Sequence, residues 1–354
     1  MNLKILVINT DLTTTKVGLF QSTRPVFVGS IQHPDDELAK FTGINDQKDY
    51  REKVILDFLK ENEVDIGSLG AVAARGGWLR PLESGTYLVN DKMLSELIEE
   101  KWGAHACHLS AQIGHSIAQK AGISCYVVDP LSMDEYEPIA RYTGHKLFRR
   151  ECLAHSLNMK AIAKHYAKEN HLNYNKITVI TVHLGTGISI AIHHKGKMVD
   201  AVNSREEGTF SGDRSGGLPV LQVVRHVIEK KLDFETFSDM VFGNGGFISY
   251  LGTKDFRKIT EMYQNGKREA IDVVDAAAYQ VAKDVGALAT VNCGKINAII
   301  FSGGMAHENY FVDLIKERVQ FIAPVVLYPG GDEMEALAEG IQRILLKEEK
   351  AKTY

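Results

Sequence analysis

The chain contains two similar strand–turn–strand segments, and this repeat constrains its fold more than any other feature. The first covers residues 5–20 (ILVINTDLTTTKVGLF) and the second covers residues 177–192 (ITVITVHLGTGISIAI). Each has an apolar strand, a polar turn rich in Thr or Gly, and a second apolar strand. Such a turn presents backbone N–H groups and small hydroxyls, which suit a bound phosphate. The repeat therefore predicts two duplicated domains, each with a hairpin of this kind.

Length, charge and cysteine content narrow the class of protein. With 354 residues, the chain is long enough for two domains with full cores. Its net charge of −4 and its lack of a basic block argue against a nucleic-acid partner. The apolar run at 5–8 is too short for a signal peptide, and no stretch approaches the roughly 20 apolar residues that span a membrane. The four cysteines have no CxxC spacing, so we expect reduced, buried thiols in a cytoplasmic protein.

Strand and helix patterns alternate along the chain, which is typical of an α/β fold. In the first half we expect strands at 4–9, 17–21, 26–31, 69–74 and 125–128, and helices at 50–62, 91–100 and 111–121. A helical run at 151–168 leads to the second hairpin. Beyond it we expect strands at 198–202, 296–301 and 323–328, and helices at 218–230, 233–241, 254–265, 268–291, 309–318 and 333–347. Asp91 is the expected N-cap of its helix, and His193 and His194 are expected at the surface.

Two glycine-containing segments follow strands, where ligands gather in α/β folds. In His183-Leu-Gly-Thr-Gly187 the glycines stand at a hairpin turn, where larger side chains would block a phosphate. The alternative is a structural hairpin with a bulge. Ser302-Gly-Gly304 lies between a strand and a helix, so its backbone could approach a nucleotide, although such a sequence is equally typical of a tight turn.

Two arginines stand in glycine-rich loops. Arg75 precedes Gly76-Gly77, and Arg214 lies in the loop 211–217. A fixed guanidinium binds carboxylate or phosphate through two parallel hydrogen bonds. The alternative for Arg214 is a local ion pair with Asp213. His155 fits either a donor to a phosphoryl group or a core histidine, and Glu333 could simply complement a helix dipole.

Eight short segments, in this order, resemble the acetate kinase family and, within it, the butyrate kinases. They are 75–82 (RGGWLRPL), 87–91 (YLVND), 126–130 (YVVDP), 183–189 (HLGTGIS), 214–219 (RSGGLP), 250–253 (YLGT), 278–283 (AYQVAK) and 321–325 (FIAPV). The resemblance extends from about residue 3 to 345. It implies two duplicated ribonuclease-H-like domains of the sugar-kinase and actin superfamily with a cleft between them. We expect one lobe at 1–152 plus about 333–354, and a nucleotide-binding lobe at 153–332.

The resemblance also implies an activity and a set of site residues. The family transfers the γ-phosphoryl group of ATP reversibly to a short-chain carboxylate, giving an acyl phosphate and ADP, and tends to form homo-oligomers. By match, Arg75 and Arg214 would hold the carboxylate and the moving phosphoryl group, to which His155 would donate. Asn9 and Glu333 would place Mg²⁺, and Asp129 would lie in the substrate cleft. Residues that would contact ATP or ADP are Lys16, His183, Gly185, Thr186, Gly187, Gly303 and Gly304.

This chemistry fits the residue types. A carboxylic acid with a pKa near that of Glu is already ionised at neutral pH, so the reaction needs no general base. It needs neutralisation of charge, because a carboxylate must approach a triphosphate. We therefore interpret Asp129 as a residue that orients an arginine or Mg²⁺ rather than as a base.

The first turn departs from the family pattern. It reads Asn9-Thr-Asp-Leu-Thr-Thr-Thr-Lys16 where the family usually has Asn-Pro-Gly-Ser-Thr-Ser-Thr-Lys, so Asp11 adds a negative charge and Leu12 an apolar side chain. Smaller departures are Ala154, Thr186 and the Ser-Gly-Asp at 211–213. Two alternatives therefore stay open: an acetate or propionate kinase, and a nucleotide-binding homologue that has lost turnover.

Overall fold

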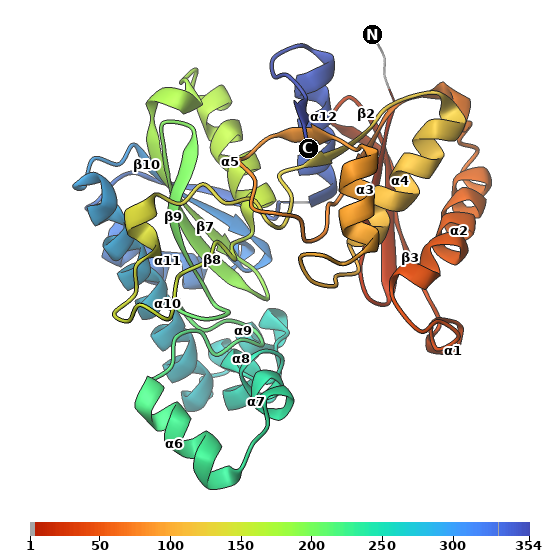
Figure 1. The fold of residues 1–354 in the computed structure, drawn as a ribbon. Coiled ribbons are helices and arrows are strands. Elements are labelled where there is room, and N and C mark those ends of the chain that lie inside the picture. Colours follow the sequence, from red (N-terminus) through yellow and green to blue (C-terminus); the bar gives the residue numbers. More distant parts are fainter. Residues whose placement is uncertain (1–3, 332) are drawn as a thin grey trace. The chain divides into compact units, whose positions relative to one another are not determined.

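The computed structural model describes residues 4–331 and 333–354, which form two compact units. Unit 1 extends to Asp134 and includes the C-terminal segment that ends at Tyr354, whereas unit 2 comprises Glu135–Gly331. The boundary between the two units therefore follows Asp134, whereas the sequence led us to expect it after residue 152. In Figure 1, unit 1 is coloured red to yellow with a dark blue C-terminal helix, and unit 2 is coloured from yellow-green to blue.

Unit 1 contains a seven-stranded sheet in the order β12-β5-β6-β4-β1-β2-β3. Its strands are β1 (Lys4–Thr10), β2 (Thr14–Gln21), β3 (Arg24–Gln32), β4 (Leu69–Ala74), β5 (Thr86–Leu88), β6 (Cys125–Val128) and β12 (Lys352–Thr353). β1 pairs antiparallel with β2 and parallel with β4. The apolar residues 5–8 of β1 are all buried, as expected for a strand covered on both faces.

Helices cover both faces of the unit-1 sheet. The helices are α1 (Asp35–Leu38), α2 (Lys48–Glu61), α3 (Asp91–Ile98), α4 (His108–Ala121) and α12 (Glu333–Leu345). Figure 1 shows α2, α3 and α4 on one side of this sheet and α12 on the other. α4 ends as expected at Gly122, whose left-handed backbone (φ 68°) suits a glycine.

Unit 2 contains a five-stranded sheet in the order β11-β10-β7-β8-β9. Its strands are β7 (Thr178–Leu184), β8 (Ile188–His194), β9 (Lys197–Asn203), β10 (Ala298–Gly303) and β11 (Val325–Pro329). α10 (Arg268–Ala289) and α11 (Asn309–Val319) share a core with one face of the sheet, and α5 (Ser156–Glu169) packs on the other through Val179 and Ile300. Both faces are therefore buried, which explains the long apolar runs of these strands.

The two sheets share one strand order, which confirms the duplication predicted from the repeat. Unit 1 has β3-β2-β1-β4-β6 and unit 2 has β9-β8-β7-β10-β11, and β5 and β12 are additions at one edge of the first sheet. In each unit three antiparallel strands precede the parallel ones. The polar turns β1–β2 and β7–β8 therefore occupy equivalent positions in the two folds.

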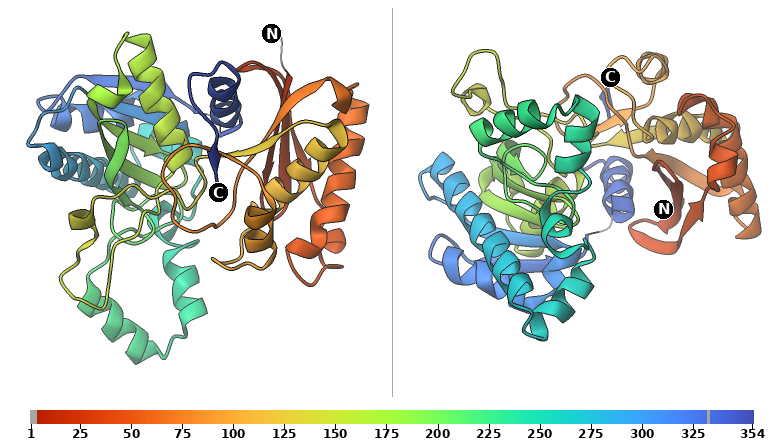
Figure 2. Two further views of the ribbon diagram at one scale, coloured as in Figure 1. Left: turned by 45° about the horizontal axis from the view of Figure 1, so that its top comes forward. Right: turned by 90° about the horizontal axis from the view of Figure 1, so that it is seen from below.

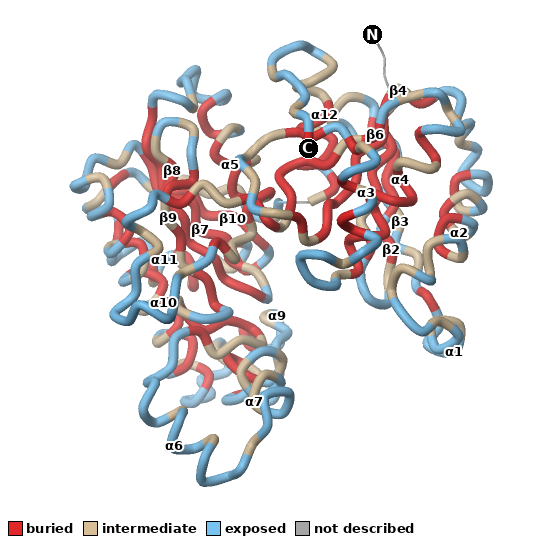
Figure 3. The backbone as a smooth tube through the Cα atoms, viewed as in Figure 1, coloured by how far each residue is buried: buried red, intermediate tan, exposed pale blue. Residues whose placement is uncertain are grey.

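A helical extension is inserted between β9 and α10. It comprises α6 (Val220–Lys230), α7 (Phe234–Val241), α8 (Gly246–Leu251) and α9 (Phe256–Gln264). Phe247 and Ile259 anchor α8 and α9 in the unit-2 core, whereas α6 has no buried residue and is pale blue in Figure 3. No helix in the described part of the chain is long and apolar enough to cross a membrane.

Three local expectations need correction, and three short elements were missed. The N-cap of α3 is Asn90, whose side chain accepts from the Met93 N–H, because Asn90 rather than Asp91 has extended backbone angles. His193 is buried and its ring lies within hydrogen-bond distance of Thr181 and Tyr174, so it is not a surface residue. Cys293 is exposed, unlike the other three cysteines. The short elements α8, β5 and β12 were not expected from the sequence.

Candidate active site

The ends of β1 and β4 and the start of α12 bring together Asn9, Arg75 and Glu333 in unit 1. β1 and β4 are parallel neighbours, and the Arg75 N–H donates to the carbonyl oxygen of Ile8, so Asn9 and Arg75 leave the same sheet edge. The Asn9 Nδ2 donates to Glu333 Oε2 at 2.9 Å, and Glu333 Oε1 lies 3.6 Å from Arg75 Nε. The Arg75 side chain is only 5% exposed, so its orientation is fixed by these neighbours. We call these three residues, with Lys16 and Asp129, the unit-1 cluster.

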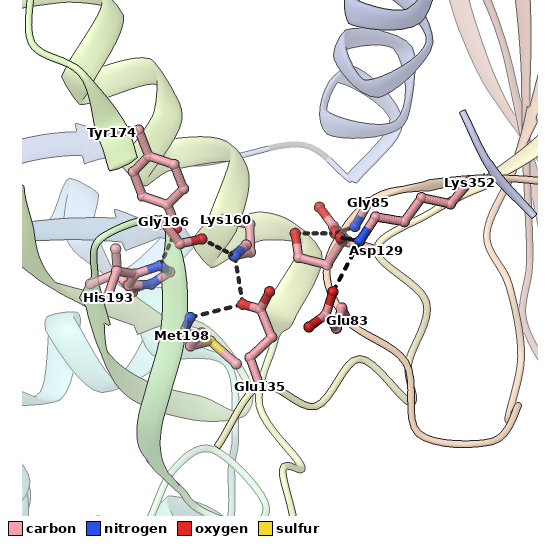
Figure 4. Close-up of polar contacts among 12 residues, drawn as sticks. Glu83, Gly85, Asp129, Glu135, Lys160, Tyr174, His193, Gly196, Met198 and Lys352 are labelled. Atoms are coloured by element: carbon pink, nitrogen blue, oxygen red, sulfur yellow. Dashed lines mark hydrogen bonds and ion pairs between the residues drawn. The ribbon is translucent and has the colours of Figure 1, made fainter. Parts of the chain in front are cut away.

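Asp129 orients Arg75 through its backbone rather than through its carboxylate. Its carbonyl oxygen accepts from Arg75 Nη1 at 3.2 Å, whereas its Oδ1 accepts from Ser84 Oγ and from the Gly85 N–H. Figure 4 shows Asp129 beside Gly85, with Lys352 reaching toward Glu83. The Asp129 carboxylate therefore secures the loop at 84–85, and Asp129 is a positioning residue in this geometry.

Lys16 stands on β2 directly opposite Asn9 in the antiparallel register, so the two side chains share one face of the sheet. Lys16 is exposed and Asn9 is half-buried. A cationic side chain thus stands on the face of the sheet that carries Asn9. Asp11 and Leu12, the departures from the family pattern, are exposed at the tip of the same hairpin.

The segment that precedes α4 adds two neighbours that sequence analysis missed. The Cys107 thiol donates to the Thr10 carbonyl oxygen at 3.2 Å and lies 3.8 Å from Asn9 Oδ1. Burial raises the pKa of Cys107 to about 12, so it remains a neutral thiol. The pKa of His105 is lowered by burial and by the charge of Arg75. Neither residue belongs to a motif, so no sequence signal pointed to them.

In unit 2, His155 and His183 lie side by side. Their ring centroids are 4.5 Å apart with planes tilted by 31°, and His155 Nδ1 is 2.9 Å from the Ser189 hydroxyl. His155 immediately precedes α5. In α5, Lys160 forms a buried ion pair with Glu135 (2.7 Å) and donates to the Gly196 carbonyl oxygen in the β8–β9 turn (2.8 Å), as Figure 4 shows. The backbone of His155 is therefore held by the anchored helix α5, and its ring is held by the contact with the Ser189 hydroxyl.

Arg214 lies against an aromatic ring. Its guanidinium carbon is 4.7 Å from the centre of the Phe242 ring, and the two residues also form a backbone bridge. Asp213 Oδ1 is 3.8 Å from Arg214 Nε, but Asp213 forms a closer ion pair with Lys254 at 3.0 Å. Burial lowers the pKa of Arg214, which Asp213 partly counteracts. Since Lys254 is the closer partner of Asp213, the local ion pair considered from sequence is not the main contact of that carboxylate.

A side chain at position 187 would displace Arg214, because Arg214 and His155 both approach Gly187. A Cβ atom on Gly187 would lie 2.5 Å from Arg214 Nη1 and 3.0 Å from His155 Cε1. Gly185 lies beside His183, and the Thr186 carbonyl oxygen accepts from the Gly212 N–H at 2.9 Å. The β7–β8 turn is thereby joined to the loop that carries Arg214.

Gly303 and Gly304 follow β10, the neighbour of β7. Gly303 has φ 92°, and a Cβ there would lie 2.3 Å from the Leu184 carbonyl oxygen, so a side chain is excluded. Gly304 has no atom within 4 Å of its Cβ position, which leaves its backbone open to close approach. The residues His155, His183, Gly185, Thr186, Gly187, Arg214, Gly303 and Gly304 form what we call the unit-2 cluster.

The unit-1 cluster suits a Mg²⁺ ion that is bound partly by nucleotide phosphates better than a metal ion held by protein ligands alone. Within residues 4–331 and 333–354, no group of three or more His, Cys, Asp or Glu side chains could hold a metal ion. Glu333 and Asn9 nevertheless supply oxygen atoms, and Mg²⁺ is usually bound by one or two carboxylates together with substrate phosphates. These residues therefore suit an ion that arrives with a nucleotide.

Both the sequence and the fold of this chain are similar to those of known proteins. A profile of the acetokinase family matches residues 134–323. The chain is 40% identical over 352 residues to butyrate kinase 1 of Clostridium acetobutylicum, which covers 99% of both chains. Its fold resembles that of a Porphyromonas gingivalis acetate kinase (TM-score 0.78, 19% identity, 97% and 100% of the two chains). It also resembles a propionate kinase from Francisella tularensis (TM-score 0.77, 17% identity, 96% and 98%).

Proposed function

Because this chain belongs to the acetokinase family, we propose that it transfers the γ-phosphoryl group of ATP reversibly to a short-chain carboxylate. The products are an acyl phosphate and ADP. The observation that carries the proposal is the 40% identity to a butyrate kinase along 99% of the chain. We therefore propose butyrate or a branched relative as the acceptor acid.

The unit-1 cluster supplies the groups that an ionised acid and a metal-bound phosphate need. Arg75 binds the carboxylate, and the Asp129 carbonyl oxygen holds its guanidinium in place. Asn9 and Glu333 would hold Mg²⁺, which neutralises phosphate charge when it is bound. The acid needs no deprotonation at neutral pH, so none of these residues has to act as a base.

The unit-2 cluster supplies the groups that a transferring phosphoryl needs. Arg214 stabilises the charge on its equatorial oxygens, and His155 donates a hydrogen bond to them. His183, Gly185, Thr186 and Gly187 line the phosphates. Gly303 and Gly304 allow the backbone to approach the adenosine. We also propose a homo-oligomer that acts in the cytoplasm, where ATP is available.

The experiment that tests the proposal is an acyl-hydroxamate assay with ATP, Mg²⁺ and straight and branched acids of two to five carbons. We expect the highest kcat/KM with butyrate or a branched acid of similar size. A preference for acetate or propionate would assign the enzyme to those kinases instead. Failure to form hydroxamate with any acid, despite measurable ATP binding, would favour a nucleotide-binding homologue without turnover.

A further inference from the structure

One buried arginine supports the turn between β1 and β2. Arg51 belongs to α2 and is only 1% exposed. Its Nη1 donates to the carbonyl oxygens of Asp11 (2.7 Å) and Thr14 (3.2 Å), and its Nη2 donates to that of Leu12 (2.6 Å). A single side chain thus binds three backbone carbonyls of the turn.

The remaining carbonyl of the turn is bound as well. The Thr13 oxygen accepts from the His33 N–H at 2.9 Å. The His33 ring lies beside Thr15, with Nε2 2.8 Å from the hydroxyl, and the same hydroxyl accepts from Arg51 Nη1 at 3.3 Å. The carbonyl oxygens of residues 11–14 are therefore all held by the body of unit 1.

This arrangement keeps the carbonyl oxygens of the turn away from its outer side. Carbonyl oxygens repel a phosphate, whereas backbone N–H groups and a nearby positive charge attract it. Arg51 binds these carbonyls from beneath the turn, and its hydrogen-bond acceptors are neutral oxygens, including Gln47 Oε1 at 2.9 Å. The Asp11 carboxylate is a nearby opposite charge, and it accepts from the Leu12 N–H at 2.8 Å. Its Nη contacts to residues 11, 12 and 14 are to main-chain atoms, so they do not depend on which side chains stand at positions 11 and 12.

We propose that Arg51 is a positioning residue that keeps the β1–β2 turn in the form that accepts the phosphates of MgATP. This inference rests on the proposed kinase function. Because the Arg51 contacts are to main-chain oxygens, they remain possible with Asp11 and Leu12 in place of the glycine and serine of the family pattern. The inference also gives a role to an arginine that lies in no recognised motif.

The test compares Arg51→Gln and Arg51→Lys with Lys53→Gln, which alters an exposed residue of the same helix. Two quantities are measured: amide hydrogen exchange of the peptide that covers residues 9–16, and KM for MgATP alongside KM for the acid. Loss of hydrogen bonds from a charged donor predicts that Arg51→Gln raises turn exchange and KM for MgATP by about tenfold or more. KM for the acid should stay at the wild-type value in every variant, and Lys53→Gln should show wild-type exchange and wild-type KM for MgATP. Arg51→Lys should give values between those of the wild type and Arg51→Gln, because an ammonium group lacks the planar set of donors of a guanidinium.

A folded Arg51→Gln variant with wild-type exchange and wild-type KM for MgATP would overturn the inference. If that variant does not fold, Arg51→Lys decides by the same two measurements, and wild-type values in it also overturn the inference. If the wild-type protein forms no acyl phosphate at all, the proposed function fails. In that case exchange in the turn and the Kd for MgATP replace the kinetic measurements, and unchanged values again overturn the role of Arg51.

Discussion

Glu333 accepts a hydrogen bond from Asn9 at 2.9 Å although 324 residues separate them in the chain. The same carboxylate lies 3.6 Å from Arg75, so one acidic group contacts both a proposed metal-site residue and the proposed carboxylate-binding arginine.

Removing the charge of Glu333 should lower the apparent affinity of the enzyme for Mg²⁺. Glu333→Gln keeps an oxygen that can accept from Asn9 but loses the carboxylate that suits Mg²⁺. We expect the Mg²⁺ concentration for half-maximal rate to rise by roughly tenfold or more. A Mg²⁺ titration of the initial rate measures this, with Glu335→Gln in the exposed part of the same helix as the control. Identical titrations for both variants would remove Glu333 from the metal site.

Truncation of Arg214 should abolish most turnover without preventing nucleotide binding. Arginines that stabilise a transferring phosphoryl group contribute about 10³–10⁵ in rate. We expect Arg214→Ala to lower kcat by about 10³ while the Kd for ATP changes little. Arg225→Ala, on the exposed surface of α6, is the matched control. Wild-type kcat in Arg214→Ala would reject the role of this arginine.

A methyl group at position 187 should disturb catalysis more than stability. The new Cβ would lie 2.5 Å from Arg214 Nη1, and this flexible end of the side chain can move away. Because a displacement of about 1 Å at a reacting group can lower the rate by 10², we expect Gly187→Ala to lose about 10² in kcat with little change in Tm. Gly286→Ala, in α10 with no atom near its Cβ position, should keep full activity. A large loss of Tm in Gly187→Ala with normal kcat would contradict this explanation.

The hydroxyl of Ser189 should affect kcat only through its contact with His155. We expect it to donate to His155 Nδ1 (2.9 Å), which leaves the proton on Nε2 for donation to the phosphoryl group. Ser189→Ala should lower kcat by about tenfold and shift the pH–rate profile. In a His155→Ala background the same change should have no further effect. A full additional tenfold loss in that background would show that Ser189 acts independently of His155.

The stability of unit 1 should depend on pH through His33. Burial, and to a lesser extent the charge of Arg51, lower the pKa of His33 to about 4. The unfolded chain therefore binds the extra proton first, and the free energy of unfolding decreases as pH falls from about 6.5 to 4. His33→Gln should reduce that slope by up to about 1.4 kcal/mol per pH unit in denaturant titrations. His145→Gln, at an exposed position, is the control, and an unchanged slope in His33→Gln would contradict the prediction.

The strands and most helices could be predicted because their apolar spacing is local. The two hairpins reveal the duplication for the same reason, since each is a continuous segment with its own buried strands. By contrast, β5 and β12 are only three and two residues long, and β12 pairs with β5 from the far end of the chain. Such elements are stabilised by tertiary pairing, which leaves no pattern in a short stretch of sequence.

The candidate site likewise contains residues that the sequence predicts and residues that it does not. Arg75, His155 and Arg214 stand in recognisable motifs, whereas the support given by Arg51 could not be predicted. In sequence Arg51 is one charged residue among several in α2, and it is buried only because a turn 40 residues earlier folds over it. His105 and Cys107 were missed because their position near Arg75 depends on how the segment before α4 meets the end of β1.

The discontinuous unit 1 also has a consequence for synthesis on the ribosome. All of unit 2 is translated before Glu333 and the rest of α12 emerge, although β1 precedes unit 2 in the chain. One face of the first sheet therefore stays uncovered until α12 has been made, and Asn9 and Glu333, which we propose to place Mg²⁺, can meet only then. The proposed role of Glu333 thus implies that a nascent chain cannot turn over ATP before α12 is complete.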